Sequence, residues 1–223
     1  MSTVILSKKT LDVLRNYSTI NSSIVFRKGN TVRTISNAEN ILAKFTSEEV
    51  FPVDFAIYDL GQFLSGISLF SNPQLEFDNE NYVTIRGGRQ SARYYFSDPE
   101  ITLKSAPEKN VNFPSADIEF NFDEDSLNDL RKASAVYGLP DLTFKTTAGE
   151  DTVTLVLHDK ENDTSNTYEQ VVPGCCTDSF SLDVKIENIR VLFGQYNVKV
   201  SKHLISEWKN FNTELVYYIA LEP

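Results

Sequence analysis

Cysteine, histidine, methionine and tryptophan are scarce in this chain of 223 residues, which contains two, two, one and one of them. Cys175 and Cys176 are adjacent, so they are poorly placed to form a disulfide with each other. Their spacing also does not match the cysteine pair of any common zinc-binding pattern. We expect reduced, partly buried thiols. Only His158 and His203 could serve as imidazole bases, and no Gly-x-Ser-x-Gly elbow occurs, so a nucleophilic hydrolase is not expected.

The chain also lacks long apolar runs and an excess of basic residues. No run approaches the roughly 18 apolar residues that span a bilayer. Ser7, Lys8 and Lys9 interrupt the apolar start, which predicts no signal peptide and favours the cytoplasm. The 21 Lys and Arg against 31 Asp and Glu give a net charge of -10. That charge argues against a protein that holds nucleic acid with its whole surface.

The spacing of apolar residues predicts three helices, over 7–17, 58–70 and 126–137. Ser7 is suited to cap the first of them, and Asp123 or Asp125 to cap the third. Glu48 and Glu49 are predicted to lie in a loop. Alternation and turn residues predict a hairpin of 23–27 with 31–35 around Lys28-Gly29-Asn30, and strands over 51–57, 74–77, 82–86, 90–96 and 118–122, with a tight turn at Gly87-Gly88.

Two segments of the chain repeat in register. Leu-x-x-Leu-Arg-x-x-Ser occurs at 11–18 and again at 127–134, and the strand and helix of 51–64 match 180–193 in the same order. Two independent matches indicate a duplication. The sequence therefore predicts two copies of one α+β unit, 1–106 and 107–223, joined by the proline-containing stretch 99–114.

Residues that would carry catalysis are not grouped in the sequence. Asp123-Glu124-Asp125 is typical of a helix start, where the dipole favours carboxylates. Gly87-Gly88-Arg89 lacks the strand-to-helix setting of a phosphate loop. Nothing resembles a metal cluster, a dinucleotide fingerprint or an ATP site. We expect a protein without catalytic residues, metal or cofactor.

Basic residues gather on the predicted helices. The first helix contains Lys8, Lys9 and Arg15 but one carboxylate, Asp12. Its duplicate contains Arg131 and Lys132 but one carboxylate, Asp129. Solvated helix faces would explain either helix alone. Arg15 and Arg131, however, occupy equivalent positions of the repeat, so a symmetric arrangement would point both toward the same place.

Several runs resemble the sliding clamps of T-even-type tailed phages. They are 16–24, Val53-Asp-Phe-Ala-Ile-Tyr-Asp-Leu60, the connector end Asn112-Phe113-Pro114, and the terminal 218–222. The block from Val53 to Leu60 is the most specific. The resemblance covers nearly the whole chain and is weakest over 140–180.

The resemblance implies a homotrimeric ring of six similar domains of the DNA-clamp fold. Each domain would pack two helices on antiparallel sheets, with the helices on the inner surface of a closed ring. Such rings encircle duplex DNA without sequence preference, are loaded by an ATP-driven clamp loader, and tether the phage polymerase for processive synthesis. The side chains implied to face the hole are Lys8, Lys9, Arg15, Arg131, Lys132 and Arg190. Their contacts should be with phosphates, and the acidic excess would then belong to the outer face.

Partners of this family dock a short peptide into an apolar pocket between domains. The resemblance implies that pocket at Ala106, Pro107, Phe113, Pro114, Ile219 and Leu221. It further implies late-transcription factors among the partners, and action in the cytoplasm of the infected bacterial host.

Two other functions remain open on the sequence. A β-rich virion structural or assembly protein could use the duplication for symmetry alone. A carbohydrate-active enzyme would require paired carboxylates in a deep acidic cleft.

Overall fold

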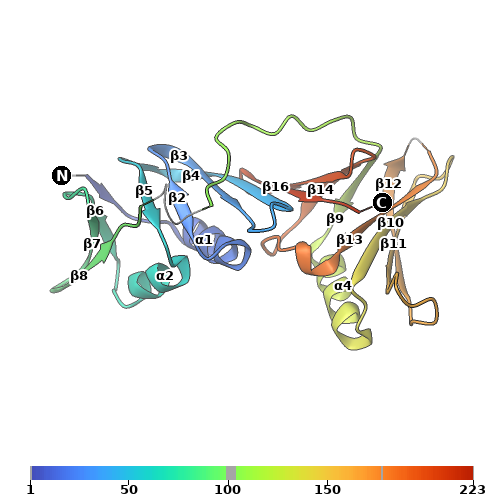
Figure 1. Cartoon of the computed structure of the whole chain (residues 1–223), viewed down its shortest axis with the longest axis horizontal. Helices are drawn as coiled ribbons and strands as arrows, with labels where there is room; N and C mark the ends of the chain where they lie inside the picture. The colour runs from blue at the N-terminus through green and yellow to red at the C-terminus, as the bar shows by residue number, and fades with distance from the viewer. Residues whose placement is uncertain (1, 99–103, 177, 223) are drawn as a thin grey trace. The chain divides into compact units, whose positions relative to one another are not determined.

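The computed structural model describes residues 2–98, 104–176 and 178–222. The chain divides into two compact units, Met1–Lys109 and Asn110–Pro223 (Figure 1). Each unit combines few helices with antiparallel strands, so the α+β class predicted from the sequence is confirmed. Residues 99–103, within the predicted connector, lie outside the described residues, and 104–117 contain no helix or strand.

Within residues 2–98 and 104–109 the structure describes two helices and short or medium strands in the first unit. In chain order these are β1 (Thr3–Val4), α1 (Lys8–Ile20), β2 (Ile24–Phe26), β3 (Gly29–Ile35), β4 (Ile41–Phe51), β5 (Phe55–Ile57), α2 (Leu60–Ser68), β6 (Gln74–Glu76), β7 (Tyr82–Gly87) and β8 (Gln90–Tyr95). One sheet has the order β1-β6-β7-β8, while β3 pairs with β4 and β2 with β5. The helices α1 and α2 contact each other, and α1 also packs on β3 and β4 (Figure 1).

Helix α1 begins where the sequence predicts and ends three residues later. The Ser7 side chain accepts a hydrogen bond from the backbone N–H of Thr10 at 3.2 Å, as an N-cap should. The helix continues to Ile20 because that side chain is buried with Val13 and Leu14. Apolar burial on one face thus fixes both its length and its orientation.

Three predictions for the first unit are wrong. The segment 51–57, predicted as one strand, is interrupted at 52–54, between the end of β4 and the start of β5. The segments predicted as a hairpin form β2 and β3, but β2 pairs with β5 and β3 pairs with β4. The carboxylate of Asp54 accepts a hydrogen bond from the backbone N–H of Lys28 at 2.6 Å, which ties the intervening turn to the residue just before β5. Glu48 and Glu49 lie in strand β4 rather than in a loop. Lys9 and Thr10 of α1 bind their carboxylates, so the contacts that place them come from a distant helix.

The hairpin of β7 and β8 is confirmed, with its turn one residue later than predicted. Gly87 is the last paired residue, opposite Gln90, and Gly88 has φ 58°. A Cβ at Gly87 would lie 2.7 Å from the Cβ of Phe70, so glycine allows a close approach there.

The second unit follows the same order of elements. These are β9 (Ile118–Phe122), α4 (Glu124–Tyr137), β10 (Asp141–Thr146), β11 (Thr152–His158), β12 (Tyr168–Cys176), β13 (Phe180–Lys185), the 3₁₀ turn η1 (Ile186–Asn188), β14 (Tyr196–Ser201), β15 (Ile205–Asn210) and β16 (Leu215–Ala220). Its strands have the order β13-β10-β11-β12-β9-β14-β15-β16, and α4 packs on β11 and β12. In the described part of each unit a strand and a helix precede four strands, a second helical segment and three more strands. The duplication predicted from the sequence is therefore present in the structure.

The second helical segment differs between the units. We predicted two helices in each domain, but the described residues of the second unit contain one α-helix and the single turn η1. Only seven residues separate η1 from β14, and the β-branched Ile189 and Val191 among them favour extended backbone. The guanidinium of Arg131 binds the carbonyl oxygens of both residues, which therefore need no helical partner.

A buried ion pair fastens strand β13 to β10. One carboxylate oxygen of Asp141, a fully buried residue, lies 2.7 Å from Lys185 Nζ, and the other accepts from the backbone N–H of Lys160 at 3.1 Å. Burial opposes ionisation of Asp141, but the hydrogen bonds from Lys185 and Lys160 bring its pKa below the ordinary value.

We expect Asp141→Asn to lower the free energy of unfolding by about 1 kcal/mol at pH 7. The folded-state pKa of Asp141 is below its unfolded value near 4, so its ionisation stabilises the fold above that pH. This stabilisation is lost as the pH falls through the folded-state pKa. Urea unfolding at pH 7, 5, 4 and 3 should show the gap between the two proteins closing below pH 4. A gap that stays constant from pH 7 to pH 3 would contradict the prediction.

Candidate nucleic-acid interface

Helix α1 presents three cations on its exposed side. Lys9 Nζ lies 2.7 Å from a carboxylate oxygen of Glu48, and Arg15 Nη1 lies 2.8 Å from one of Asp12. Lys8 is exposed and has no ion pair within the described ranges. Exposed pairs of this kind contribute at most about 1 kcal/mol each, so an incoming phosphate can replace them. The helix carries three cations against one carboxylate.

Helix α4 is not basic as a whole, which corrects the expectation from its sequence. It begins at Glu124, so Glu124 and Asp125 belong to its first turn and Asp129 follows one turn later. The helix therefore carries three carboxylates and only two basic residues, Arg131 and Lys132. The helix dipole stabilises negative charge at this end, which accounts for the early start. Lys132 is exposed, with its Nζ 3.3 Å from Asp129.

Arg131 differs from Arg15 although the two positions are equivalent in the repeat. Its guanidinium donates to the carbonyl oxygens of Ile189 and Val191 at 2.8 and 3.2 Å. Burial lowers the pKa of Arg131 from its ordinary value. Arg131 nevertheless remains charged, because a guanidinium group is not deprotonated in proteins. Arg131 therefore holds the chain after η1 against α4.

Arg190 lies between the two residues that Arg131 binds. It is exposed, and its Nε donates to the carbonyl oxygen of Glu187 at 2.9 Å. The structure thus brings Arg131 and the segment of Arg190 together in the second unit, and Lys8, Lys9 and Arg15 together in the first.

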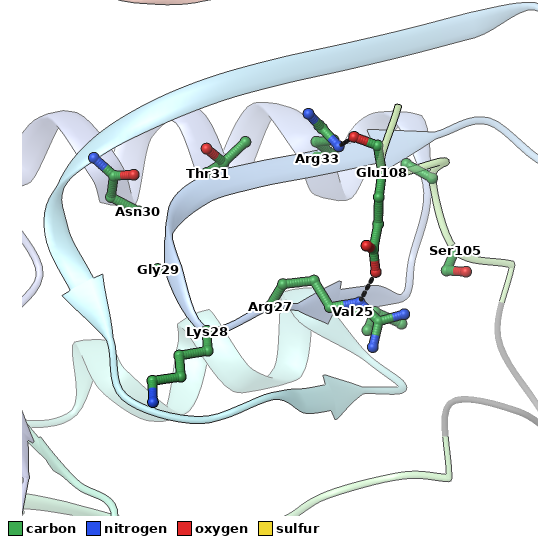
Figure 2. A pocket seen from close by; sticks show the side chains of 10 residues that line it. Val25, Arg27, Lys28, Gly29, Asn30, Thr31, Arg33, Ser105 and Glu108 are labelled. Carbon is green, nitrogen blue, oxygen red and sulfur yellow. Dashed lines mark hydrogen bonds and ion pairs between the residues drawn. The ribbon is translucent and has the colours of Figure 1, made fainter. Parts of the chain in front are cut away.

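The residues implied for a peptide pocket have different environments. Ala106 lines a cavity of about 300 Å³ in the first unit, and Arg33 donates to the carbonyl oxygen of Pro107 at 3.2 Å. Figure 2 shows the side chains around this cavity. In the second unit Phe113 and Pro114 are half-buried. Ile219 is 0% exposed because alternate residues of β16 face the core, and Leu221, directly after the strand, continues this alternation and is 6% exposed.

Three basic side chains of that cavity are not among the residues predicted from the sequence: Arg27, Lys28 and Arg33. A signal was present, since three cations flank one glycine-containing turn. The same turn residues also favour a simple hairpin, and only the actual strand pairing brings the turn beside residues 105–108.

The described part of the chain contains no group of three His, Cys, Asp or Glu side chains that could hold a metal ion. None of its described helices has the length and apolar character needed to cross a membrane. Both thiols are free, with Cys175 exposed and Cys176 half-buried, so the expectation of partial burial holds for Cys176 alone.

Solved structures show that this is the DNA-clamp fold. PCNA from Thermococcus kodakaraensis matches with a TM-score of 0.75 at 12% identity, covering 99% of each chain. A Helicobacter pylori beta clamp, solved with a DNA ligase peptide, matches with a TM-score of 0.68 at 15% identity, covering 99% of this chain and 66% of that one.

Sequence comparison identifies the family. The family described as "DNA polymerase processivity factor" matches residues 7–100. A sliding clamp of Vibrio phage KVP40 is 34% identical over 221 residues, which cover 97% of this chain and 98% of that protein. The chain belongs to the sliding clamps, a family of DNA polymerase processivity factors. The resemblance noted in the sequence is thereby confirmed, and the alternative of a virion structural protein loses its support.

Proposed function

We propose that the chain forms a homotrimeric ring that encircles duplex DNA and tethers the replicative polymerase of a phage. Each unit, 1–106 and 107–223 in the sequence-based division, serves as one clamp domain. An ATP-dependent clamp loader places the ring, which has no catalytic activity of its own and acts in the cytoplasm of the infected host. Late-transcription factors are further partners. Membership of the sliding clamps supports this proposal.

The observation that carries DNA binding is the exposed basic side of α1 in a chain of net charge -10. Lys8, Lys9 and Arg15 lie on one short helix, and each is exposed. With Lys132 and Arg190 they would contact phosphates only, which permits sliding because no base edge is read. Arg131 would act indirectly, because it holds the backbone on both sides of Arg190.

Strand β8 is our candidate for a contact between subunits. It stands at the end of the order β1-β6-β7-β8, and five of its six residues are exposed. Natural proteins seldom leave an edge strand of this length unprotected, so pairing with another copy is a direct way to cover it.

The experiment that tests the ring compares retention on circular and linear DNA. Loaded protein should stay on a nicked circular duplex and slide off the same duplex after linearisation. Light scattering should give three times 25.2 kDa for the purified protein at concentrations where the ring is closed. Equal retention on both templates would overturn the proposal, whatever the mass.

The triple variant Lys8→Glu, Lys9→Glu, Arg15→Glu should reduce stimulation of the polymerase about ten-fold, because three phosphate contacts become repulsive. Stimulation is measured as the length of product made on primed circular DNA. The matched control carries Lys109→Glu, Lys145→Glu and Lys209→Glu. These substitutions change the net charge by the same amount at residues outside the helices. Equal losses in both variants would assign the effect to net charge rather than to α1.

A further inference from the structure

The cavity of about 300 Å³ in the first unit is basic (Figure 2). It lies where the turn between β2 and β3 meets residues 105–108. Arg27, Lys28 and Arg33 line it together with one carboxylate, that of Glu108. Beside the lining, Asp54 pairs with Arg27 at 3.1 Å, so three cations stand near two carboxylates. This local excess of positive charge contrasts with the net charge of -10, so an anion is the ligand that the cavity favours.

The chain itself puts a carboxylate into this cavity. An oxygen of Glu108 lies 3.0 Å from Arg27 Nε, and Arg33 donates to the backbone carbonyl oxygen of Glu108 (Figure 2). The carboxylate side chain is 72% exposed and belongs to a segment without helix or strand. An exposed pair of this kind is weak, so a second carboxylate can replace it at Arg27.

Other groups of the cavity remain available to a ligand. The ammonium group of Lys28 forms no ion pair in the ranges that the structure describes, while its backbone N–H donates to Asp54 at 2.6 Å. Gly29 has φ 123°, and a Cβ there would meet no atom within 4 Å, so the backbone at this point is open to close approach. The ligand could therefore contact both a guanidinium and an ammonium group.

The orientation of β3 separates this cavity from the proposed DNA-binding side. Val32 and Thr34 of β3 are buried, on the face that packs against α1. Side chains alternate along a strand, so Arg33 lies on the opposite face. The basic residues of α1 and the cavity are thus on different sides of the β3–β4 pair, which favours a protein partner over the encircled DNA.

We propose that this cavity binds an acidic segment of a partner protein. One carboxylate of the segment replaces Glu108 at Arg27, and a second pairs with Lys28. The inference rests on the proposed function, since the partner would be a protein held at the clamp. It differs from the apolar pocket implied by the resemblance in the chemistry it recognises.

Fluorescence anisotropy with fluorescein-labelled hexaglutamate at low ionic strength tests the proposal on the full chain. Glu108→Gln should tighten binding about two- to five-fold, because the competing carboxylate is gone. Arg27→Gln and Lys28→Gln should each weaken it by a similar factor. Labelled hexaglutamine should not bind. Glu80→Gln and Lys109→Gln make the same charge changes outside the cavity and should leave the affinity unchanged.

Three results would overturn the inference. They are an unchanged affinity for Glu108→Gln, an equal loss for Lys109→Gln and Arg27→Gln, and displacement of the peptide by a short duplex DNA as readily as by unlabelled hexaglutamate. Retention of the unaltered protein on circular DNA tests the proposed function separately. If the protein is retained on circular DNA but the variants do not change hexaglutamate affinity as expected, only this inference is overturned. If the variants change the affinity as expected but the protein is not retained on circular DNA, only the proposed function is overturned.

Discussion

Trp208→Ala is expected to lower the free energy of unfolding of the second unit by about 3–5 kcal/mol. Trp208 lies on β15 and is fully buried. Its ring packs against Phe122, Phe144 and Tyr196, with centroids 5.6, 6.4 and 6.3 Å away. Its Nε1 donates to the hydroxyl of Ser206 at 3.0 Å. Alanine would leave a cavity among aromatic rings that cannot collapse around it, and would remove that hydrogen bond.

Urea unfolding followed by far-ultraviolet circular dichroism measures this loss, because the variant lacks the only tryptophan of the chain. Phe211→Ala is the matched control. It truncates an aromatic side chain in the same unit, at a residue that is 54% exposed. It should change the free energy of unfolding by no more than about 0.5 kcal/mol. Similar losses for the two variants would show that Trp208 is not the centre of this core.

Arg131→Gln should destabilise the second unit by about 2 kcal/mol. The substitution removes charge-assisted hydrogen bonds to the carbonyl oxygens of Ile189 and Val191, and glutamine is too short to replace both. Arg131→Lys should lose about half as much, since an ammonium group is a point charge without the planar fork of arginine. Urea unfolding of the three proteins at pH 7 gives the comparison.

Arg15→Gln is the natural control, because the repeat places Arg15 at the position equivalent to Arg131. Its only described ion pair is the exposed contact with Asp12, so its removal should cost no more than about 0.5 kcal/mol. It should instead reduce the retention of loaded protein on circular DNA at raised salt. If Arg131→Gln unfolds like the unaltered chain, the contacts with the two carbonyls do not hold the segment.

Local sequence rules predicted the elements whose determinants lie close together in the chain. Ser7 and Asp123 cap α1 and α4 through hydrogen bonds to backbone N–H groups three residues away. The β7–β8 hairpin was likewise predicted, because its turn residues and both strands are contiguous. Caps and tight turns are decided within a few residues, so composition and spacing suffice to find them.

The pairing of the strands was not predicted, because contacts between residues far apart in the sequence determine it. The side chain of Asp54 helps to assign β2 to β5, and contacts with α1 accompany the extension of β4 through Glu49. The missing second helix of the second unit has a similar cause. Arg131 reaches the carbonyls of a segment nearly 60 residues later, which no local rule could reveal.

The candidate site was found in part. Exposure of Lys8, Lys9 and Arg15 follows from helical periodicity, because the buried stripe of α1 fixes the opposite face. The equivalence of Arg15 and Arg131 in sequence did not extend to their environments. The basic cavity required the strand pairing and residues 105–108 to be placed beside each other.

By itself the sequence, scarce in cysteine and histidine and without a basic excess, determined a duplicated α+β chain and its family resemblance. These depend on short-range periodicity and on residue identity, which are readable along one dimension. The tertiary structure decided which cations remain exposed, which one is buried against backbone carbonyls, and where three basic side chains meet one carboxylate. Those outcomes depend on long-range packing and desolvation, which arise only when distant segments come into contact.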